Sequence, residues 1–176
     1  RVDGKIPIGY RVGGSAICAM TLMGAPDFGT NDAAKAAVRR AVDFTLRGLD
    51  DPLMSPVQYD AGYDVRGWGY TYALSFLLRV RGTDLVEEGK KERVEGGARW
   101  CIDALQKTEI PQVGGWNYAR PPGRDKVAPP SPFMTAPTLQ ALFEARKAGF
   151  EADEKVVARA LDFLESAREP SGGIVY

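Results

Sequence analysis

The sequence repeats one unit, and this repeat is the feature that most constrains the fold. The segment ARWCIDALQKTEIPQVGGWNY (98–118) aligns with ARALDFLESAREPSGGIVY (158–176). Both begin with Ala-Arg, continue through apolar residues at helical spacing, pass a glutamate and a proline, and reach Gly-Gly with a tyrosine three residues beyond. A looser copy, AVDFTLRGLDDP, begins at Ala41. Such self-similarity predicts an array of one repeated supersecondary unit.

Each unit is expected to contain two helices of different character. The first is apolar, nearly free of acidic residues and closed by a glycine suited to a left-handed cap, as in residues 13–25, 69–82 and 135–149. The second has one apolar face, formed by residues at helical spacing: Val94, Ala98, Cys101, Ile102 and Leu105, or Val156, Ala160, Phe163 and Ala167. We therefore predict that the first helices are buried on most sides and the second helices keep one face in water.

The fold class that follows is all-α, with about three αα-hairpins curved into an α/α toroid or a partial toroid. A straight helical solenoid is the alternative. The chain is predicted to form a single repeat domain, 1–176, with units at about 3–49, 58–107 and 112–168 and the opening of a further unit at 171–176. A start at Arg1 without a methionine is also compatible with a fragment of a longer chain.

Composition excludes several classes of function. Lys+Arg and Asp+Glu both number 23, whereas a nucleic-acid-binding domain would usually carry a basic excess. The chain has no histidine, so a zinc hydrolase, a Ser-His-Asp hydrolase and a Cys-His protease are excluded for it. No apolar run approaches the roughly 20 residues that span a bilayer, and no leader is recognisable. Neither a cofactor nor a metal site is expected, and localisation stays open between cytoplasm and export.

The two cysteines, Cys18 and Cys101, each fall in an apolar helical pattern. Free cysteines of this kind usually behave as small buried hydrophobic residues, and we expect that here. A disulfide between the two is the alternative that the spacing leaves open.

The quoted segments resemble a known family. GGWNYARP, MTAPTLQALFEARKAG, VARALDFLES and GGIVY are similar to the repeats of the prenyltransferase and squalene-cyclase superfamily, and more narrowly to bacterial repeat proteins with no assigned reaction. The resemblance covers nearly the whole chain and is clearest over 99–176. It implies a terpenoid-cyclase-like α/α toroid, although members of that superfamily commonly have around six hairpins.

The catalytic motifs of the family do not carry over. Squalene-hopene-type cyclases use an Asp-x-Asp-Asp motif, and the nearest match, Asp50-Asp51 in GLDDP, lacks its first carboxylate. Protein prenyltransferases hold zinc with Asp, Cys and His, and the chain has no His. The related thioester proteins carry Cys-Gly-Glu-Gln, which neither cysteine matches. The resemblance therefore favours a non-catalytic binding or scaffold module.

The candidate ligand site is an aromatic rim at one end of the array, since loops before successive first helices emerge at the same end. Such aromatic residues bind apolar, isoprenoid-like chains or stack on sugar rings. The alternative is structural, with loop aromatics clamping one hairpin to the next. The candidate residues are Tyr59, Tyr63, Arg66, Trp68, Tyr72, Trp116 and Tyr118.

The alternative function is a cyclase- or lyase-like enzyme. Asp60 and Asp64 lie among tyrosines, and a carboxylate in an apolar mouth can have a raised pKa and act as a general acid. Missing sequence or a second subunit would complete such a site. The structural alternative is a loop ion pair between Asp64 and Arg66. Three hairpins also leave open apolar edges, which predicts a homo-oligomer.

Overall fold

The structure is a computed structural model that describes residues 6–56, 64–110, 112–117 and 129–175. These residues form helices and no strand. The elements are α1 (Ile8–Met23), α2 (Asp32–Leu49), the short 3-10 helix η1 (Pro52–Met54), α3 (Arg66–Val80), the 3-10 helix η2 (Glu88–Lys90), α4 (Lys91–Thr108), α5 (Pro132–Lys147) and α6 (Glu154–Ser166). The prediction of an all-α fold is confirmed.

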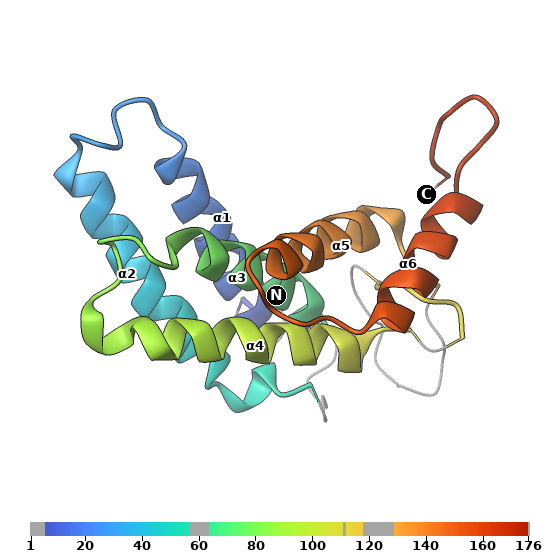
Figure 1. Ribbon diagram of the computed structural model, residues 1–176, viewed down its shortest axis with the longest axis horizontal. Helices are drawn as coiled ribbons and strands as arrows, with labels where there is room; N and C mark the ends of the chain where they lie inside the picture. The colour runs from blue at the N-terminus through green and yellow to red at the C-terminus, as the bar shows by residue number, and fades with distance from the viewer. Residues whose placement is uncertain (1–5, 57–63, 111, 118–128, 176) are drawn as a thin grey trace.

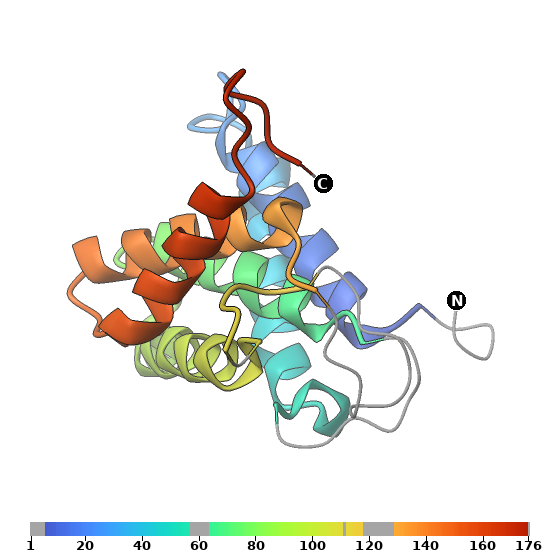
Figure 2. The same cartoon turned by 90° about the vertical axis from the view of Figure 1, so that its right-hand side faces the viewer.

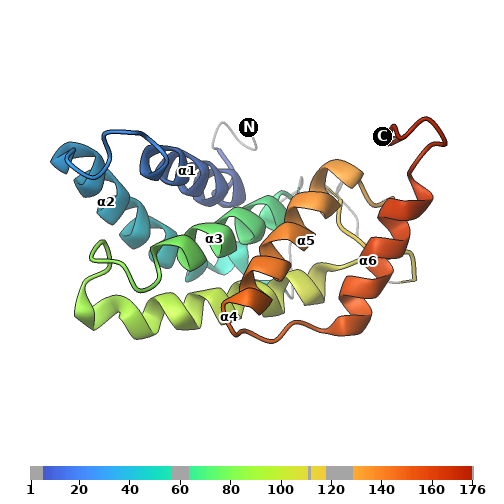
Figure 3. The same cartoon turned by 45° about the horizontal axis from the view of Figure 1, so that its top comes forward.

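The six long helices form three hairpins in a row. The α1/α2 hairpin lies at one end, α3/α4 in the middle and α5/α6 at the other end (Figure 1). Helix α3 is central: it packs against α1 on one side, α5 on another and α4 beneath (Figure 3). The first helix of the middle unit, α3, thus has the other two first helices, α1 and α5, as neighbours.

The inner helices α1, α3 and α5 run parallel. Near their starts, the backbones of Gly9 in α1 and Gly69 in α3 touch, and near their ends the Arg79 guanidinium donates to the Met20 carbonyl across 3.4 Å. Between α3 and α5, the Thr71 and Thr138 hydroxyls share a hydrogen bond of 2.8 Å. The chain segments that enter these helices therefore lie at one end of the array.

The outer helices are amphipathic, and α2 and α6 begin at side-chain caps, whereas α4 begins without one. The Asn31 side chain accepts from the Ala34 amide at the start of α2, and the Asp153 carboxylate accepts from the Lys155 amide at the start of α6. Each cap satisfies an amide that lacks a partner within the helix. The apolar faces of α2, α4 and α6 point toward the inner helices, as their spacing predicts.

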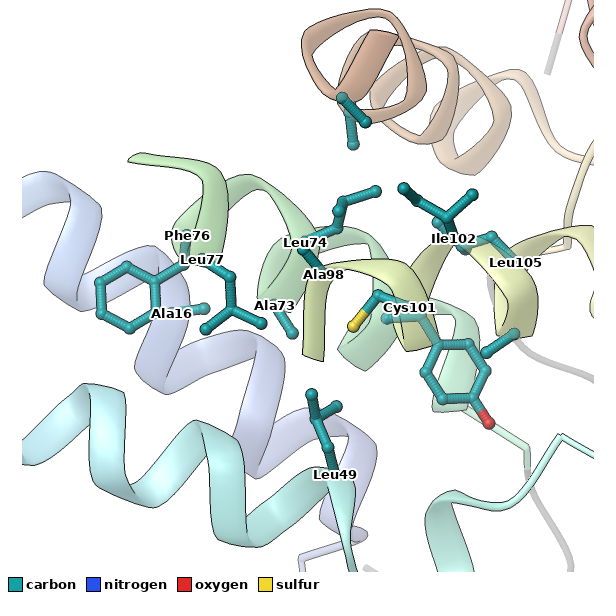
Figure 4. Packing of buried hydrophobic residues seen from close by; sticks show 14 of the residues in the cluster. Ala16, Leu49, Ala73, Leu74, Phe76, Leu77, Ala98, Cys101, Ile102 and Leu105 are labelled. Atoms are coloured by element: carbon teal, nitrogen blue, oxygen red, sulfur yellow. The ribbon is translucent and has the colours of Figure 1, made fainter. Parts of the chain in front are cut away.

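The core runs through all three hairpins. Leu77 of α3, Leu46 and Leu49 of α2 and the backbone of Gly97 in α4 meet at one point, so α3 joins two outer helices. Figure 4 shows Phe76 and Leu77 in this packing, with Cys101, Ile102 and Leu105 supplied by α4. The prediction that the inner helices bury their large side chains is confirmed at Phe76, Leu77, Leu139 and Leu142, each at most 2% exposed.

Helix α1 departs from the expectation of burial on most sides. Arg11, Cys18 and Leu22 are exposed along it, because α1 ends the row and has an inner neighbour only on the α3 side. The expectation of burial is therefore wrong for Cys18 and confirmed for Cys101; both thiols are free. Burial raises the pKa of the Cys101 thiol.

The glycine caps follow the prediction in two of three cases. Gly82 and Gly149 have φ of 74° and 89°, the left-handed conformation that glycine adopts without a steric penalty. Gly24 instead has φ of −85° and continues the helical geometry at the end of α1. Ser131 is the N-cap residue of α5 and Pro132 its first residue, and the Ser131 hydroxyl makes no capping bond.

The described residues form an open row, since the first and third hairpins do not pack closely on each other. Figure 2, which looks from the α5/α6 end, shows α6 with no further hairpin beside it. Residues 169–175 fold back in a turn in which the Val175 amide donates to the Ala167 carbonyl. The closed toroid and the further unit at 171–176 remain predictions.

We expect Leu142→Ala to lower the free energy of unfolding by about 2–5 kcal/mol, because it empties a fully buried site between the hairpins. Leu53→Ala is the matched control: Leu53 is 51% exposed, so the loss should stay within about 0.5 kcal/mol. Urea unfolding followed by circular dichroism measures both. Equal losses in the two variants would contradict the assignment of α5 to the core.

Candidate ligand groove

A groove of about 700 Å³ lies over the inner helices. Helix α3 contributes to its middle, and α1 and α5 line its two sides. Because residues of all three inner helices line one groove, the row of hairpins is concave on this face. The lining residues are Ile17, Met20, Thr21, Tyr72, Ser75, Leu78, Arg79, Pro137, Gln140, Glu144, Lys147 and Ala148.

An aromatic cluster adjoins the groove at the N-terminal ends of α3 and α5. Trp68 and Tyr72 lie one helical turn apart on α3, with ring centroids 4.6 Å apart and planes tilted by 58°. The Trp68 indole also stacks on Phe133 of α5, at 6.1 Å and 17°. Phe133 is 54% exposed, whereas Trp68 and Tyr72 are half-buried. Of these three rings, Tyr72 lines the groove.

Trp68 also contacts α1. A Cβ atom on Gly13 would lie 2.6 Å from Cδ1 of the indole, so the absence of a side chain at Gly13 makes room for the ring. Trp68 thus touches the inner helices on both sides of α3. These contacts correspond to the clamping role that was its structural alternative, and Trp68 does not itself line the groove.

Tyr72 is the aromatic residue that lines the groove itself. Burial raises the pKa of its phenol, because the anion would lose hydration. The phenol is therefore neutral at physiological pH and can both donate and accept a hydrogen bond. A ligand that lies against this ring meets an apolar face and one polar group.

The opposite end of the groove is charged. Arg79 of α3 and Glu144 and Lys147 of α5 line it near the C-terminal ends of their helices. Cations are favoured there because the helix dipole places partial negative charge at the last carbonyls, and Arg79 donates to one of them at Met20. The groove thus changes from aromatic to charged along the helices.

Asp64 and Arg66 form a tight pair before and at the start of α3. The Asp64 carboxylate accepts from Nε of Arg66 at 2.8 Å, from Nη2 at 2.7 Å and from the Arg66 amide at 3.0 Å. Arg66 donates as well to the Ser55 carbonyl, and its side chain is 3% exposed. The structural alternative, a loop ion pair, is confirmed. Neither residue lines the groove.

Trp116 is not brought to Trp68 and Tyr72. Its side chain is 2% exposed, and its indole Nε1 donates to the Leu105 carbonyl of α4 at 2.8 Å. Its amide donates to the Thr135 hydroxyl of α5 at 3.0 Å. These contacts join α4 to α5, which is the clamping role. The other predicted site residues, Tyr59, Asp60, Tyr63 and Tyr118, lie outside the described residues.

The two glycines before Trp116 belong to the same contact between α4 and the third hairpin, which we call the joint. Gly114 and Gly115 have φ of 81° and 76°, and each contacts the third hairpin closely. A Cβ atom at Gly114 would lie 2.5 Å from the Arg159 carbonyl of α6, and one at Gly115 would lie 2.7 Å from the Thr135 hydroxyl. The Gly-Gly-Trp motif, conspicuous in the sequence, is here a packing element.

An ion pair supports this joint. Glu109, with a side chain 6% exposed, accepts from Nε of Arg159 at 2.9 Å and from its Nη2. The pair ties the end of α4 to α6. Bidentate geometry of this kind fixes orientation as well as charge.

A second hollow, of about 750 Å³, lies between α4 and the connection from α5 to α6. Phe150 lies at its wall, and the guanidinium groups of Arg81 and Arg99 lie 5.0 and 5.8 Å from the centre of its ring. Arg81 also pairs with Glu95 and donates to the Ala148 carbonyl. These contacts hold the C-terminal ends of α3 and α5 against the N-terminal half of α4.

No protein-family model, curated protein or solved structure matches the chain. Among the described residues, no helix combines the length and the apolar character needed to cross a bilayer. Within the same residues, no three acidic, histidine or cysteine side chains are gathered closely enough to hold a metal ion. The geometry of the groove is therefore the basis for a functional proposal.

Sequence reasoning missed most of the groove. It searched the loops, whereas the groove is lined by polar residues within the apolar helices. Their spacing gave a signal: Tyr72, Ser75 and Arg79 recur at three and four residues, as do Gln140, Glu144 and Lys147. A polar stripe on an otherwise apolar helix indicates a face turned to water or to a ligand.

We expect Gly114→Ala to destabilise the protein more than Gly149→Ala. Both positions have positive φ, which costs alanine about 1–2 kcal/mol, but only at Gly114 would the new methyl group meet α6. Overpacking adds about 1–3 kcal/mol. Thermal and urea unfolding of the two variants measure the difference, and equal losses would show that Gly114 is needed only for its backbone conformation.

Proposed function

We propose that the chain is a binding or scaffold module of the terpenoid-cyclase-like repeat type, and that it holds an apolar, isoprenoid-like or carbohydrate ligand in the groove over α1, α3 and α5. The observation that carries the proposal is the groove itself, with Tyr72 in its wall and Trp68 in contact with Tyr72. Three parallel helices that alternate with amphipathic ones support the relation to that repeat family.

The chemistry of the lining defines the ligand class. The Tyr72 ring contributes dispersion and apolar burial, which suits a hydrocarbon chain or the apolar face of a sugar. The hydroxyls of Tyr72 and Ser75 and the amide of Gln140 supply donors and acceptors, which suits a ligand with hydroxyl groups. A groove of this size is within the range of small-molecule sites.

The groove supports binding better than the enzymatic alternative. Asp64 is committed to Arg66 and lies away from the groove, and Asp60 is outside the described residues. Glu144 is the one carboxylate among the residues that line the groove. The lining thus presents aromatic and hydrogen-bonding surface rather than a pair of carboxylates.

Self-association belongs to the same proposal. The two sides of the groove are formed by the terminal hairpins. Each of these carries exposed apolar residues, among them Leu22 on α1 and Phe143 on α5. Patches of this kind favour association between copies. A second copy would extend the walls that α1 and α5 provide.

We expect Tyr72→Ala to weaken ligand binding by at least about 1 kcal/mol, or about fivefold in dissociation constant, because the ring lines the groove. Trp68→Ala should weaken binding similarly through the loss of its contact with Tyr72. Titration calorimetry with farnesol and with maltohexaose measures binding and separates the two ligand classes.

Tyr72→Phe and Trp100→Phe are the controls. Phenylalanine keeps the ring of residue 72 and removes its hydroxyl, so farnesol binding should persist and maltohexaose binding should fall. Trp100 lies on outer helix α4, edge-on to Tyr70 at 5.4 Å, and its change should leave both affinities intact. Absence of binding for both probes in the unaltered protein would refute the proposed function.

A further inference from the structure

The charged residues that line the groove belong to the last turns of two inner helices. They are Arg79 of α3 and Glu144 and Lys147 of α5, and all three are exposed. Two positive charges against one negative charge leave this end of the groove with an excess of positive charge. The rest of the lining, which includes the Tyr72 ring, is uncharged. Charge is thus confined to one end of the groove.

Arg79 and Lys147 lie at the same end because α3 and α5 run side by side. Thr71 of α3 and Thr138 of α5 share a hydrogen bond of 2.8 Å. Arg79 follows Thr71 by eight residues and Lys147 follows Thr138 by nine, so the two helices carry the cations to about the same level. The Arg81 guanidinium joins the same two helix ends, since it donates to the carbonyl that follows α5 at 2.7 Å.

Neither cation of the groove has an acidic partner among the residues that the structure describes. Arg81 and Arg146, which neighbour them, each pair with a glutamate instead. The Arg79 guanidinium donates to the Met20 carbonyl across 3.4 Å, which uses one of its five N–H groups. The other donors of Arg79 and the ammonium group of Lys147 are therefore available to an anion in the groove.

The helix ends limit how strongly an anion is attracted. The last carbonyls of a helix carry partial negative charge, which opposes an anion, although the effect falls off within the last turn. Arg79 and Lys147 each carry a full positive charge and lie in the lining itself, so they contact a bound anion directly. A head group with one negative charge, in contact with both cations, fits this balance of charges.

The uncharged part of the groove has room for a hydrocarbon chain. Tyr72 precedes Arg79 by seven residues on α3, which is about 10 Å at the rise of an α-helix. Ile17 of α1 and Pro137 of α5 line the two sides. An extended chain of about ten carbon atoms, with bonds of about 1.5 Å, covers the same distance.

We propose that the groove binds an amphiphile with one negative charge, whose carboxylate contacts Arg79 and Lys147 and whose hydrocarbon chain lies against Tyr72. A guanidinium group suits this head group because it donates two parallel hydrogen bonds to a carboxylate. The ligand thereby acquires a direction, with its head at the C-terminal ends of α3 and α5. This inference rests on the proposed function and specifies its apolar ligand class.

Three probes with the same ten-carbon chain separate the head from the tail. In titration calorimetry, decanoate should bind more tightly than decanol by about threefold to tenfold, the range that one or two exposed ion pairs supply. Decyltrimethylammonium should bind less tightly than decanol, because the two cations repel it. The advantage of decanoate should shrink when the salt concentration is raised.

Charge variants assign the head group to these residues. Arg79→Gln and Lys147→Gln should each weaken decanoate binding by about threefold and leave decanol binding unchanged. Glu144→Gln should strengthen decanoate binding, because it removes the one negative charge of the lining. Arg146→Gln is the matched control: Arg146 is an exposed cation next to Lys147 that does not line the groove, and its change should alter neither affinity.

The outcomes distinguish this inference from the proposed function. Equal binding of decanoate and decanol, or tighter binding of decyltrimethylammonium, overturns the anionic head group and leaves the apolar ligand class standing. Decanoate binding that neither Arg79→Gln nor Lys147→Gln weakens overturns the assigned contacts in the same way. Binding of maltohexaose without decanoate or decanol contradicts this inference and supports the carbohydrate alternative. Absence of binding for every probe refutes both proposals.

Discussion

The close approach of α1 and α3 determines how the other elements are arranged. Glycines permit it: a Cβ atom on Gly9 would lie 2.5 Å from the Val65 carbonyl, and one on Gly69 would lie 3.1 Å from the Gly9 backbone. Glycine within a helix costs about 0.5–1 kcal/mol relative to alanine, so these positions need a compensating gain. The gain is a tight joint that buries α3 and brings α1 to the side of the groove.

Helix α3 is fixed at both ends by arginines that make several contacts each. At its start, Arg66 binds the Asp64 carboxylate and the Ser55 carbonyl. Just beyond its end, Arg81 pairs with Glu95, donates to the Ala148 carbonyl and lies over the Phe150 ring. Because α3 lines the middle of the groove, these contacts also set the position of Tyr72 relative to α1 and α5.

The helices and their layers could be predicted from sequence because they depend on local patterns. The stripe Val94, Ala98, Cys101 and Leu105 specifies one buried face of α4, and all four residues are at most 1% exposed. The exposure of Cys18 could not be predicted in this way. It depends on which hairpin ends the row, and that is a property of the assembly of units rather than of the α1 sequence.

The site was harder to predict than the fold for a related reason. The groove is formed by single faces of three helices that are distant in sequence, and each face contributes only a few polar residues, such as Ser75 and Gln140. Loop aromatics gave a stronger signal, but their roles depend on backbone geometry. The polar residues on α3 and α5 indicate a site only in an arrangement in which α1, α3 and α5 run parallel and line one groove.

Trp68 and Trp116 illustrate this dependence on geometry. Trp68 is the third residue of α3, so the phase of the helix directs its side chain, and the ring comes to lie between Gly13 and Phe133. Trp116 lies in a loop well before α5, where two glycines with positive φ redirect the backbone and the indole enters the core against α4. The same residue type before or at the start of successive first helices thus has two roles. Its distance from the start of the following helix decides which role each tryptophan takes.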